Sequence, residues 1–416
     1  MIRFIHAADT HIDSPFEGLE AYDGAPVDTL PGATRRAFES LVDLAIDEAV
    51  DFLLIAGDVY GGDWKDVSTG LFFVRQMNRL HSAGIPAYLI SGNHDAASVL
   101  TRRLSLPGNV HLFSSRKAES KVVPGLPVVV HGRSFPQRAV PENLVPDYPA
   151  PESGMFNIGL LHTSLAGAPG HDTYAPCSLR DLTDKGYDYW ALGHVHKPQV
   201  LCRDPWVVFA GNTQGRHIRE TGPRGCRLVT VNDSREVVDA EHRVMDLVRW
   251  AKVAVDLAAV ESEREALKRI GAGLQQAFAQ AEGRLLAVRV TLTGATALHG
   301  RLKRNLPWLR AECIAWGQMT AGDRVWIEEV EVRTSALQDL AQLAARDDLT
   351  RVVLETLRAA GARRLETDAE TADMLQALPS EIRAEVEEEL ADTGRAILLD
   401  DVRSILLDAL QKGGET

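Results

Sequence analysis

The sequence predicts an α/β protein with a layered sheet-and-helix domain, a smaller second α/β domain and a helical C-terminal segment. From residue 1 to about 235, short apolar runs typical of buried strands alternate with segments of helical periodicity. A shorter strand and helix pattern begins near residue 242, and beyond Ser335 the pattern is helical and acidic. Short groups of Asp, His and Asn also follow several of the predicted strands.

The first domain is expected to span residues 1–240. Its helices are predicted over Thr34–Glu48 and Val67–Ser82, where apolar residues recur at spacings of three and four. The apolar runs predict strands at Ile2–Ala7, Phe52–Ala56, Ala87–Ser91, Pro127–Gly132, Asn157–His162, Tyr187–Leu192, Trp206–Ala210 and Gly225–Val231.

The second domain is expected over residues 241–335, with a helix at Val260–Glu282 and strands at Trp250–Leu257, Leu285–Thr293 and Val325–Thr334. Residues 336–416 are expected to form an acidic helical segment. An apolar stripe between Glu381 and Leu410 suits packing against the second domain or docking into the groove of a partner protein, and both alternatives stay open.

The charge distribution argues against a surface built for nonspecific DNA binding. The net charge is −13, and residues 366–416 contain fourteen acidic and four basic residues, so the rest of the chain is nearly neutral. No apolar stretch approaches the ~18 residues of a membrane span, and the chain becomes polar at Asp9, which leaves no room for a signal peptide. We therefore expect a cytoplasmic protein without a membrane segment.

Five polar groups follow, or nearly follow, apolar runs in the first domain. Because ligands of open α/β sheets bind at the carboxyl ends of the strands, we expect these groups to meet at one edge. The groups are Asp9-Thr10-His11, Gly57-Asp58, Gly92-Asn93-His94-Asp95, His162 and Gly193-His194-Val195-His196.

This set of carboxylates, imidazoles and one amide predicts a site for two divalent metals. Asp58 is the candidate for the bridging carboxylate, and the mixed N/O set favours Mn²⁺, Fe²⁺ or Zn²⁺ over Mg²⁺ or Ca²⁺. Two metals clamp a phosphoester and acidify the water that attacks it. The first metal is assigned Asp9, His11 and His196, and the second Asn93, His162 and His194.

His94 is expected to point away from the metals and to serve as a catalytic acid. As an imidazolium it would protonate the leaving oxygen or stabilise charge in the transition state. Asp95 is predicted to orient and charge His94, with capping of the following helix at Ala96–Leu104 as the alternative.

These motifs resemble those of the calcineurin-like metallophosphoesterases, in particular nuclease subunits of the SbcD type and most of all the YhaO-like DNA repair exonucleases. The resemblance covers roughly residues 1–235. The matching segments are Ala8-Asp9-Thr10-His11-Ile12-Asp13, Gly57-Asp58-Val59-Tyr60, Gly92-Asn93-His94-Asp95, Gly193-His194-Val195-His196-Lys197-Pro198-Gln199 and Gly211-Asn212-Thr213-Gln214-Gly215-Arg216-His217.

The resemblance implies a four-layer metallophosphoesterase β-sandwich with flanking helices, a small α/β capping domain and a helical C-terminal tail. It also implies Mn²⁺-dependent cleavage of DNA, a homodimer, and an SMC-like ATPase partner of the SbcC/YhaN kind docked on the C-terminal segment. One departure is Gly61, which stands where archaeal relatives have a His three residues after the bridging Asp.

Two basic groups are candidates for DNA contact. Arg216 and Arg219 would meet phosphates or pair with nearby acids, and a short cluster in the second domain would form either a DNA-facing edge or a solvated helix face. The cluster consists of Arg301, Lys303, Arg304 and Arg310. The nearby tryptophans suit core packing or base stacking; they are Trp308, Trp316 and Trp326.

The sequence thus predicts a two-metal phosphodiesterase that hydrolyses DNA in repair or end processing, as an exonuclease and with endonuclease activity as a further mode. Two alternatives stay open, because the same metals serve many substrates. One is a phosphoesterase for nucleotides or other small phosphoesters. The other is a protein that acts mainly as a scaffold for an ATPase.

Overall fold

The computed structural model describes residues 1–14, 32–62, 67–97, 105–165 and 174–337, together with the single positions 352, 355, 356 and 402. The chain forms two compact units, residues 1–168 with 172–250 and residues 251–416 with 169–171. The division falls ten residues after the expected boundary at 240, because strand β12 (Val237–Val244) completes a sheet of the first unit. Almost all of the predicted C-terminal segment at 336–416 lies outside the described residues.

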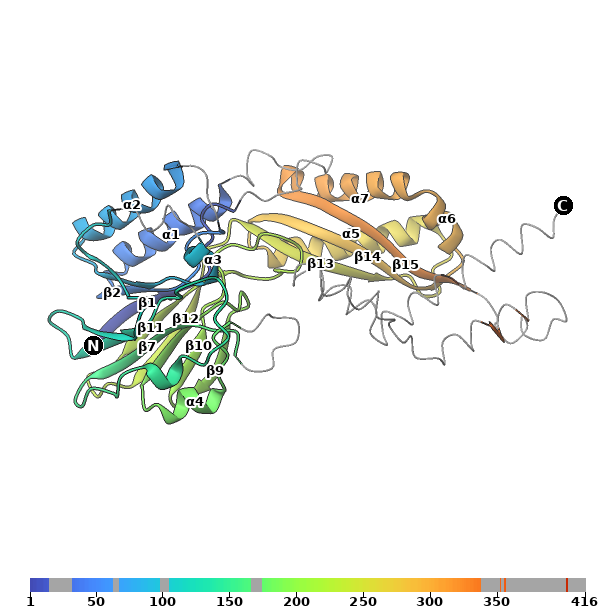
Figure 1. Ribbon diagram of the computed structural model, residues 1–416. Coiled ribbons are helices and arrows are strands. Elements are labelled where there is room, and N and C mark those ends of the chain that lie inside the picture. The colour runs from blue at the N-terminus through green and yellow to red at the C-terminus, as the bar shows by residue number, and fades with distance from the viewer. Residues whose placement is uncertain are drawn as a thin grey trace, which may run out of the picture. The chain divides into compact units, whose positions relative to one another are not determined.

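The first sheet of the first unit has six strands in the order β12-β11-β1-β2-β3-β4. Strands β1, β2, β3 and β4 run parallel, and β11 pairs antiparallel with β1 (Figure 1). Besides β12, the strands are β1 (Ile2–Ala7), β2 (Phe52–Ala56), β3 (Ala87–Ile90), β4 (Val110–Leu112) and β11 (Gly225–Val231).

The second sheet also has six strands, in the order β5-β6-β7-β8-β10-β9. Its four central strands are parallel, and both edge strands are antiparallel to their neighbours. The strands are β5 (Glu119–Val122), β6 (Val128–Gly132), β7 (Phe156–His162), β8 (Tyr189–Gly193), β9 (Gln199–Arg203) and β10 (Trp206–Phe209).

The two sheets face each other across one apolar core, in which Phe4 of the first sheet meets Tyr189 of the second edge-on, with ring centroids 5.4 Å apart. Helices α1 (Ala33–Asp47) and α2 (Val67–Ser82) cover the outer face of the first sheet. Helix α4 (Leu179–Asp184) packs on the outer side of the second (Figure 1). The order helix, sheet, sheet, helix confirms the predicted four-layer sandwich.

The second unit contains a three-stranded sheet in the order β13-β14-β15. Helices α5 (Glu263–Gln280) and α7 (Leu306–Ala321) pack on this sheet, and Trp308 and Trp316 lie partly buried against its apolar core. Trp308 and Trp316 therefore serve core packing in this unit, and Trp326 is buried as well. Its remaining elements are β13 (Val248–Asp256), β14 (Leu285–Thr296), α6 (His299–Arg304) and β15 (Val325–Ala336).

Among the described residues, no helix combines the length and the apolar character needed to cross a membrane.

Candidate metal centre

The five polar groups of the first domain converge where strands of both sheets end. Asp9, Asp58 and Asn93 follow β1, β2 and β3 of the first sheet, His162 ends β7, and His194 follows β8. Hydrogen bonds join them across the gap between the sheets. The His194 backbone N–H donates to both carboxylate oxygens of Asp9, at 3.1 and 3.0 Å. The fold therefore brings the predicted ligands of both sheets to one place.

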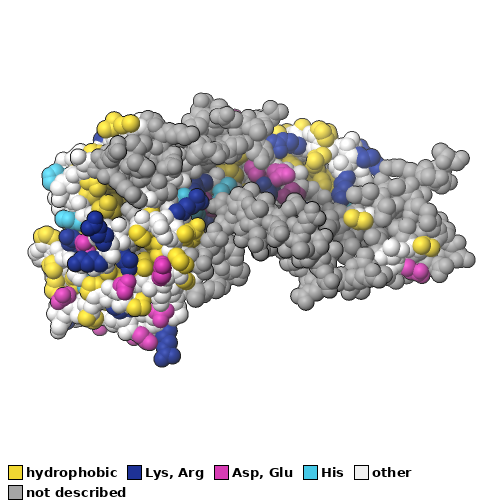
Figure 2. All heavy atoms as spheres, in the orientation of Figure 1, with side chains coloured by type: hydrophobic (Ala, Val, Ile, Leu, Met, Phe, Trp, Pro, Cys, Tyr) yellow, Lys and Arg dark blue, Asp and Glu magenta, His cyan; other side chains and the backbone are white. Residues whose placement is uncertain are grey.

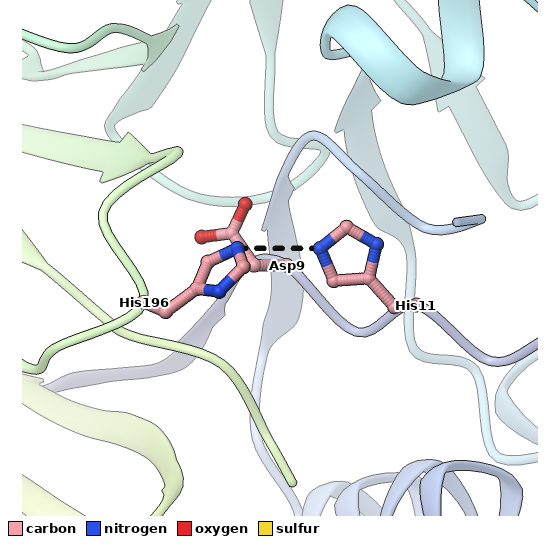
Figure 3. A group of neighbouring side chains, drawn as sticks. All are labelled: Asp9, His11 and His196. Atoms are coloured by element: carbon pink, nitrogen blue, oxygen red, sulfur yellow. Dashed lines mark hydrogen bonds between the residues drawn. The ribbon is translucent and has the colours of Figure 1, made fainter. Parts of the chain in front are cut away.

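One group of candidate ligands consists of Asp9, His11 and His196 (Figure 3), whose ligand atoms lie within 4.8 Å of one another. The Nε2 atoms of the two imidazoles face each other at 3.3 Å, and the Asp9 carboxylate lies beside them. These are the three residues assigned to the first metal from the sequence. Two imidazole nitrogens and a carboxylate that face one point form a donor set suited to Mn²⁺, Fe²⁺ or Zn²⁺.

A second group consists of Asp9, Asp58 and His162, again with ligand atoms within 4.8 Å of one another. The Nε2 atom of His162 lies 3.4 Å from Oδ2 of Asp58 and 2.9 Å from Oδ1 of Asn93. Its Nδ1 lies 2.9 Å from the Ala56 carbonyl oxygen, so Nδ1–H donates there and Nε2 faces the two oxygen ligands. Such a carbonyl partner fixes the tautomer of a metal-binding histidine.

The electrostatics of this group favour a bound cation. Burial lowers the pKa of His162, but the charge of Asp58 and its hydrogen bond, together with Asp9 and the Ala56 carbonyl, outweigh burial and raise that pKa to about 9. Burial raises the pKa of Asp9 to about 6, with the neighbouring histidines opposing the shift. Two carboxylates are thus buried together with too little positive charge around Asp9, which a divalent cation would supply.

His194 reaches the same site by its ring. Its imidazole lies edge-on to that of His162, with ring centroids 5.1 Å apart, and Tyr174 lies at 5.1 Å from it. The placement agrees with the assignment of His194 beside His162 and Asn93. Asp9 rather than Asp58 is common to both ligand groups of the structure, so the bridging role of Asp58 stays a proposal.

Several candidate ligands sit on strained backbone. Asp9, His11, Asp58 and His194 have φ values of 49°, 38°, 51° and 98°, in the left-handed region that non-glycine residues rarely adopt. Gly57 has φ 90°, and a Cβ there would lie 2.6 Å from His162 Nδ1. Such strain is typical of sites where the surrounding structure fixes residues for function.

Among the described residues, the ring of His11 is poorly supplied with hydrogen bonds. His11 Nδ1 is buried and has no hydrogen-bond partner, although buried polar atoms usually have one. Its Nε2 instead faces His196. The residues present therefore fit a two-metal centre held by imidazole, carboxylate and amide groups.

His94 lies beside the candidate ligands without belonging to either group. Its ring is edge-on to that of His11, with centroids 5.2 Å apart, and its backbone N–H donates to Oδ1 of Asp58 at 3.0 Å. Burial lowers the pKa of His94, while the charge of Asp58 opposes the shift. The position of the ring suits the acid role proposed for it, whereas the lowered pKa makes the imidazolium the minor form at neutral pH.

Asp95 has a different role from the one expected. Its carboxylate accepts hydrogen bonds from the backbone N–H groups of Val59 at 3.2 Å, Tyr60 at 2.9 Å and Gly92 at 3.2 Å. The predicted orientation of His94 by Asp95 is therefore corrected, since three main-chain donors occupy the carboxylate. Asp95 instead ties the loop after β2 to the loop after β3, near the start of helix α3 (Asn93–Ala97).

A loop after β10 adds a residue to which the sequence assigned no role. Oε1 of Glu220 lies 2.5 Å from Nδ1 of His196 and 3.2 Å from Nη2 of Arg216. Burial raises the pKa of Glu220, but Arg216 and His196 outweigh it and hold that pKa well below its usual range. Arg216 thus pairs with an acid, one of its two predicted alternatives, and Arg219 is exposed nearby.

Two residues of the basic cluster form contacts within the second unit. Arg301 pairs with Glu263 at 2.5 Å, and Arg310 donates to the carbonyls of Ile327 and Glu328 at 3.3 and 3.1 Å. On the face shown in Figure 2, basic, acidic and hydrophobic side chains are interspersed over the described surface of the first unit. DNA contact by Arg301, Lys303, Arg304 and Arg310 stays a prediction.

Comparison with known proteins matches both units. A family model described as calcineurin-like phosphoesterase matches residues 2–198, and one described as the middle domain of metallophosphoesterase YhaO matches residues 250–335. The uncharacterized metallophosphoesterase YhaO of Bacillus subtilis (strain 168) is 40% identical over 260 residues, which cover 62% of this chain and 63% of that protein.

Proteins named DNA double-strand break repair protein Mre11 are also similar. The one from Haloferax volcanii is 28% identical over 276 residues, covering 65% of this chain and 58% of its own length. The one from Methanosarcina mazei is 26% identical over 236 residues, covering 56% of this chain and 36% of its own length. The matched segments span less than two thirds of each of these relatives.

The protein is a metallophosphoesterase. Three observations together show this: the four-layer fold, the carboxylates and imidazoles gathered between its sheets, and the family match. The first domain belongs to the calcineurin-like phosphoesterase family. More particularly, the chain combines this domain with a domain of the YhaO middle type, which confirms the resemblance found in the sequence.

Proposed function

We propose that this protein is a two-metal-dependent phosphodiesterase that hydrolyses DNA, as an exonuclease and with endonuclease activity as a further mode, in DNA repair or end processing. The observation that carries the proposal is the pair of ligand groups that share Asp9, at the carboxyl ends of strands from both sheets. The similarity to proteins named for DNA double-strand break repair supports DNA as the substrate.

The metals proposed are two divalent ions, Mn²⁺ first and Fe²⁺ or Zn²⁺ as alternatives. When bound, they supply Lewis acidity and an acidified water at neutral pH. Asp9, His11 and His196 would hold one ion. The other would be held by Asn93, His162 and His194, and Asp58 is proposed to reach both.

His94 is proposed to act on the leaving group. Its ring lies beside His11 but outside both ligand groups, so its nitrogens remain available to a substrate at the metals. As an imidazolium it donates a proton to the departing oxygen of the phosphodiester. Asp95 supports this indirectly, because it fixes the loops that carry Asp58 and Asn93.

The proposal extends to partners and location. We propose a homodimer, docking of an SMC-like ATPase of the SbcC/YhaN type on residues 336–416, and a cytoplasmic location. We also propose DNA contacts by the basic residues of the second unit and by Arg216 and Arg219. The apolar stripe of the C-terminal segment, read from the sequence, supports the docking proposal.

A phosphoesterase for nucleotides or other small phosphoesters is the second candidate. It is favoured by the internal pairing of Arg216 with Glu220 and of Arg301 with Glu263, which reduces the charge these residues offer to a polymer. A protein acting mainly as an ATPase scaffold is a third candidate, but the complete set of candidate ligands argues against it.

One experiment separates these candidates. The Mn²⁺-reconstituted protein is incubated with end-labelled single- and double-stranded DNA, beside a chromogenic small phosphodiester. The proposal predicts shortening of DNA, and loss of that activity in the Asp58→Asn variant. Hydrolysis of the small ester alone would replace DNA by a small substrate, and hydrolysis of neither would favour the scaffold.

A further inference from the structure

The carboxylate of Glu220 is buried beside a candidate metal ligand, and both of its oxygens are engaged. Glu220 is 5% exposed, and its Oε1 lies 2.5 Å from Nδ1 of His196. Its Oε2 accepts hydrogen bonds from the Arg216 backbone N–H at 2.7 Å and from Asn212 Nδ2 at 2.9 Å. Because donors hold both oxygens of the carboxylate, rotation away from the His196 ring would break these hydrogen bonds.

The contacts around His196 Nδ1 assign its proton. Nη2 of Arg216 lies 3.3 Å from the same nitrogen, and a guanidinium only donates. The nitrogen cannot accept from Arg216 while it donates to Glu220, and the carboxylate contact is far shorter. The hydrogen therefore sits on Nδ1, and the lone pair of Nε2 faces His11 and Asp9 (Figure 3).

The same loop also fixes the main chain of His196. The backbone N–H of Asn212 donates to the His196 carbonyl at 3.1 Å. The Arg224 guanidinium donates to this carbonyl too, and to Oδ1 of Asn212 at 3.2 Å. The ring and the backbone of His196 are thus held by one segment, residues 212–224, which follows β10 of the second sheet.

We propose that Glu220 is a positioning residue for the metal centre: it accepts the Nδ1 hydrogen of His196 and so presents Nε2 to the metal shared with Asp9 and His11. The inference deepens the proposed function, since it rests on the metal centre but not on DNA as the substrate. Carboxylate partners of this kind set the tautomer and basicity of metal-binding histidines, and their loss typically weakens metal binding by about 10- to 100-fold.

The test is a calorimetric titration of Mn²⁺ into the chelator-stripped full-length protein and its Glu220→Gln variant. We expect two binding events in the wild type, of which one weakens by about 10- to 100-fold in the variant while the other changes less than about 2-fold. Equal affinities in the two proteins, with native circular dichroism, would overturn the inference.

The Glu328→Gln variant is a matched control. Glu328 is also a buried glutamate paired with an arginine, at 2.7 Å from Arg289, but it lies in the second unit and contacts no candidate ligand. It should leave both Mn²⁺ affinities unchanged. An equal loss in this control would show that any buried Glu→Gln change lowers the affinity, and would overturn the specific role of Glu220.

A second measurement keeps the inference testable even if Glu220→Gln does not fold. In metal-free wild-type protein labelled with ¹⁵N-histidine, the ring signals of His196 are assigned by their absence in a His196→Gln variant. Protonation at Nδ1 is expected, and protonation at Nε2 alone would overturn the inference. Neither measurement uses DNA, so both outcomes are independent of whether the protein is a nuclease.

Discussion

The backbone N–H of His194 donates to both carboxylate oxygens of Asp9, at 3.1 and 3.0 Å. Asp9 follows β1 of the first sheet and His194 follows β8 of the second, so one carboxylate ties together the ends of two facing sheets. The backbone N–H of Asp9 also donates to the Gly57 carbonyl at 3.1 Å. The centre is therefore built into the sandwich rather than placed on a mobile loop, which favours a preorganised site.

The acid role of His94 predicts a loss of cleavage without a loss of metal. In His94→Ala, metal content measured by elemental analysis should stay at the wild-type value. The rate of cleavage should fall by about 10²- to 10⁴-fold, the usual contribution of a positioned proton donor. His81→Ala is the matched control, because His81 is exposed at the end of α2. Full activity of His94→Ala would remove this residue from the mechanism.

The contacts of Asp95 predict a structural loss. In Asp95→Asn the amide group would present donors to main-chain N–H groups of Val59, Tyr60 and Gly92 that now donate to the carboxylate. Because unpaired buried donors cost about 1–3 kcal/mol each, the free energy of unfolding should fall by about 2 kcal/mol or more. Urea unfolding of the metal-free protein measures this free energy for the wild type and the variant.

Asp147→Asn controls for the change of charge. Asp147 pairs with Arg133 at 2.7 Å, but its side chain is 64% exposed, and such surface pairs contribute little. Its stability should stay within about 1 kcal/mol of the wild type. A similar small effect at Asp95 would show that its three hydrogen bonds do not hold the two loops.

His6 predicts a loss of stability in acid. It is fully buried between the sheets, where Nδ1 lies 3.0 Å from the Tyr189 hydroxyl and Nε2 3.2 Å from the Leu192 carbonyl. Burial, with a smaller contribution from Arg227, lowers its pKa to about 3. Below pH 6.5 the unfolded chain binds a proton that the folded chain rejects, so stability falls as the pH drops from 6.5 towards 3.

The His6→Gln variant isolates this effect. The slope for one group is about 1.4 kcal/mol per pH unit. The difference in unfolding free energy between wild type and His6→Gln should therefore shrink between pH 7 and pH 4, measured by urea unfolding without metal. A difference that is constant over this range would show that His6 accepts its proton without unfolding.

The basic cluster of the second unit predicts a change in the salt dependence of DNA binding. Replacing Arg301, Lys303 and Arg304 by Ala should weaken binding and flatten the plot of log affinity against log salt by up to about 0.9 per lost phosphate contact. Arg310 is left in place, because its guanidinium holds two backbone carbonyls of β15. Fluorescence anisotropy with labelled DNA measures both quantities.

The control removes the same number of positive charges from the first unit, by replacing the exposed residues Lys117, Lys121 and Arg235 with Ala. This variant should keep the wild-type salt slope. An unchanged slope in the cluster variant would exclude the cluster from the DNA interface.

In the first unit, the sequence predicted the inner strands of each sheet but not its edge strands. All the strands predicted for the first domain are inner strands, whose apolar runs are buried on both faces. The four missed strands, β4, β5, β9 and β12, are the edges of the two sheets and are half exposed. Edge strands are short and polar, so their sequences resemble loops.

The candidate ligands were predictable because each follows an apolar strand, but their supporting contacts were not. Glu220 contacts His196 only because the loop after β10 returns to the site, a long-range contact that no local pattern encodes. Glu220 stands four residues after Arg216 and pairs with it, but outside a helix this spacing does not mark an ion pair, so the sequence carried no local signal for Glu220. The backbone donors that occupy Asp95 likewise depend on the loop after β2.

The most direct test of the central claim is anomalous diffraction at the manganese edge from crystals grown with Mn²⁺. We expect two peaks per chain, about 3.5–4 Å apart as in other two-metal sites. One should lie at Asp9, His11 and His196, and the other at Asn93, His162 and His194, with Asp58 between them. A single peak, or peaks away from these residues, would contradict the two-metal centre.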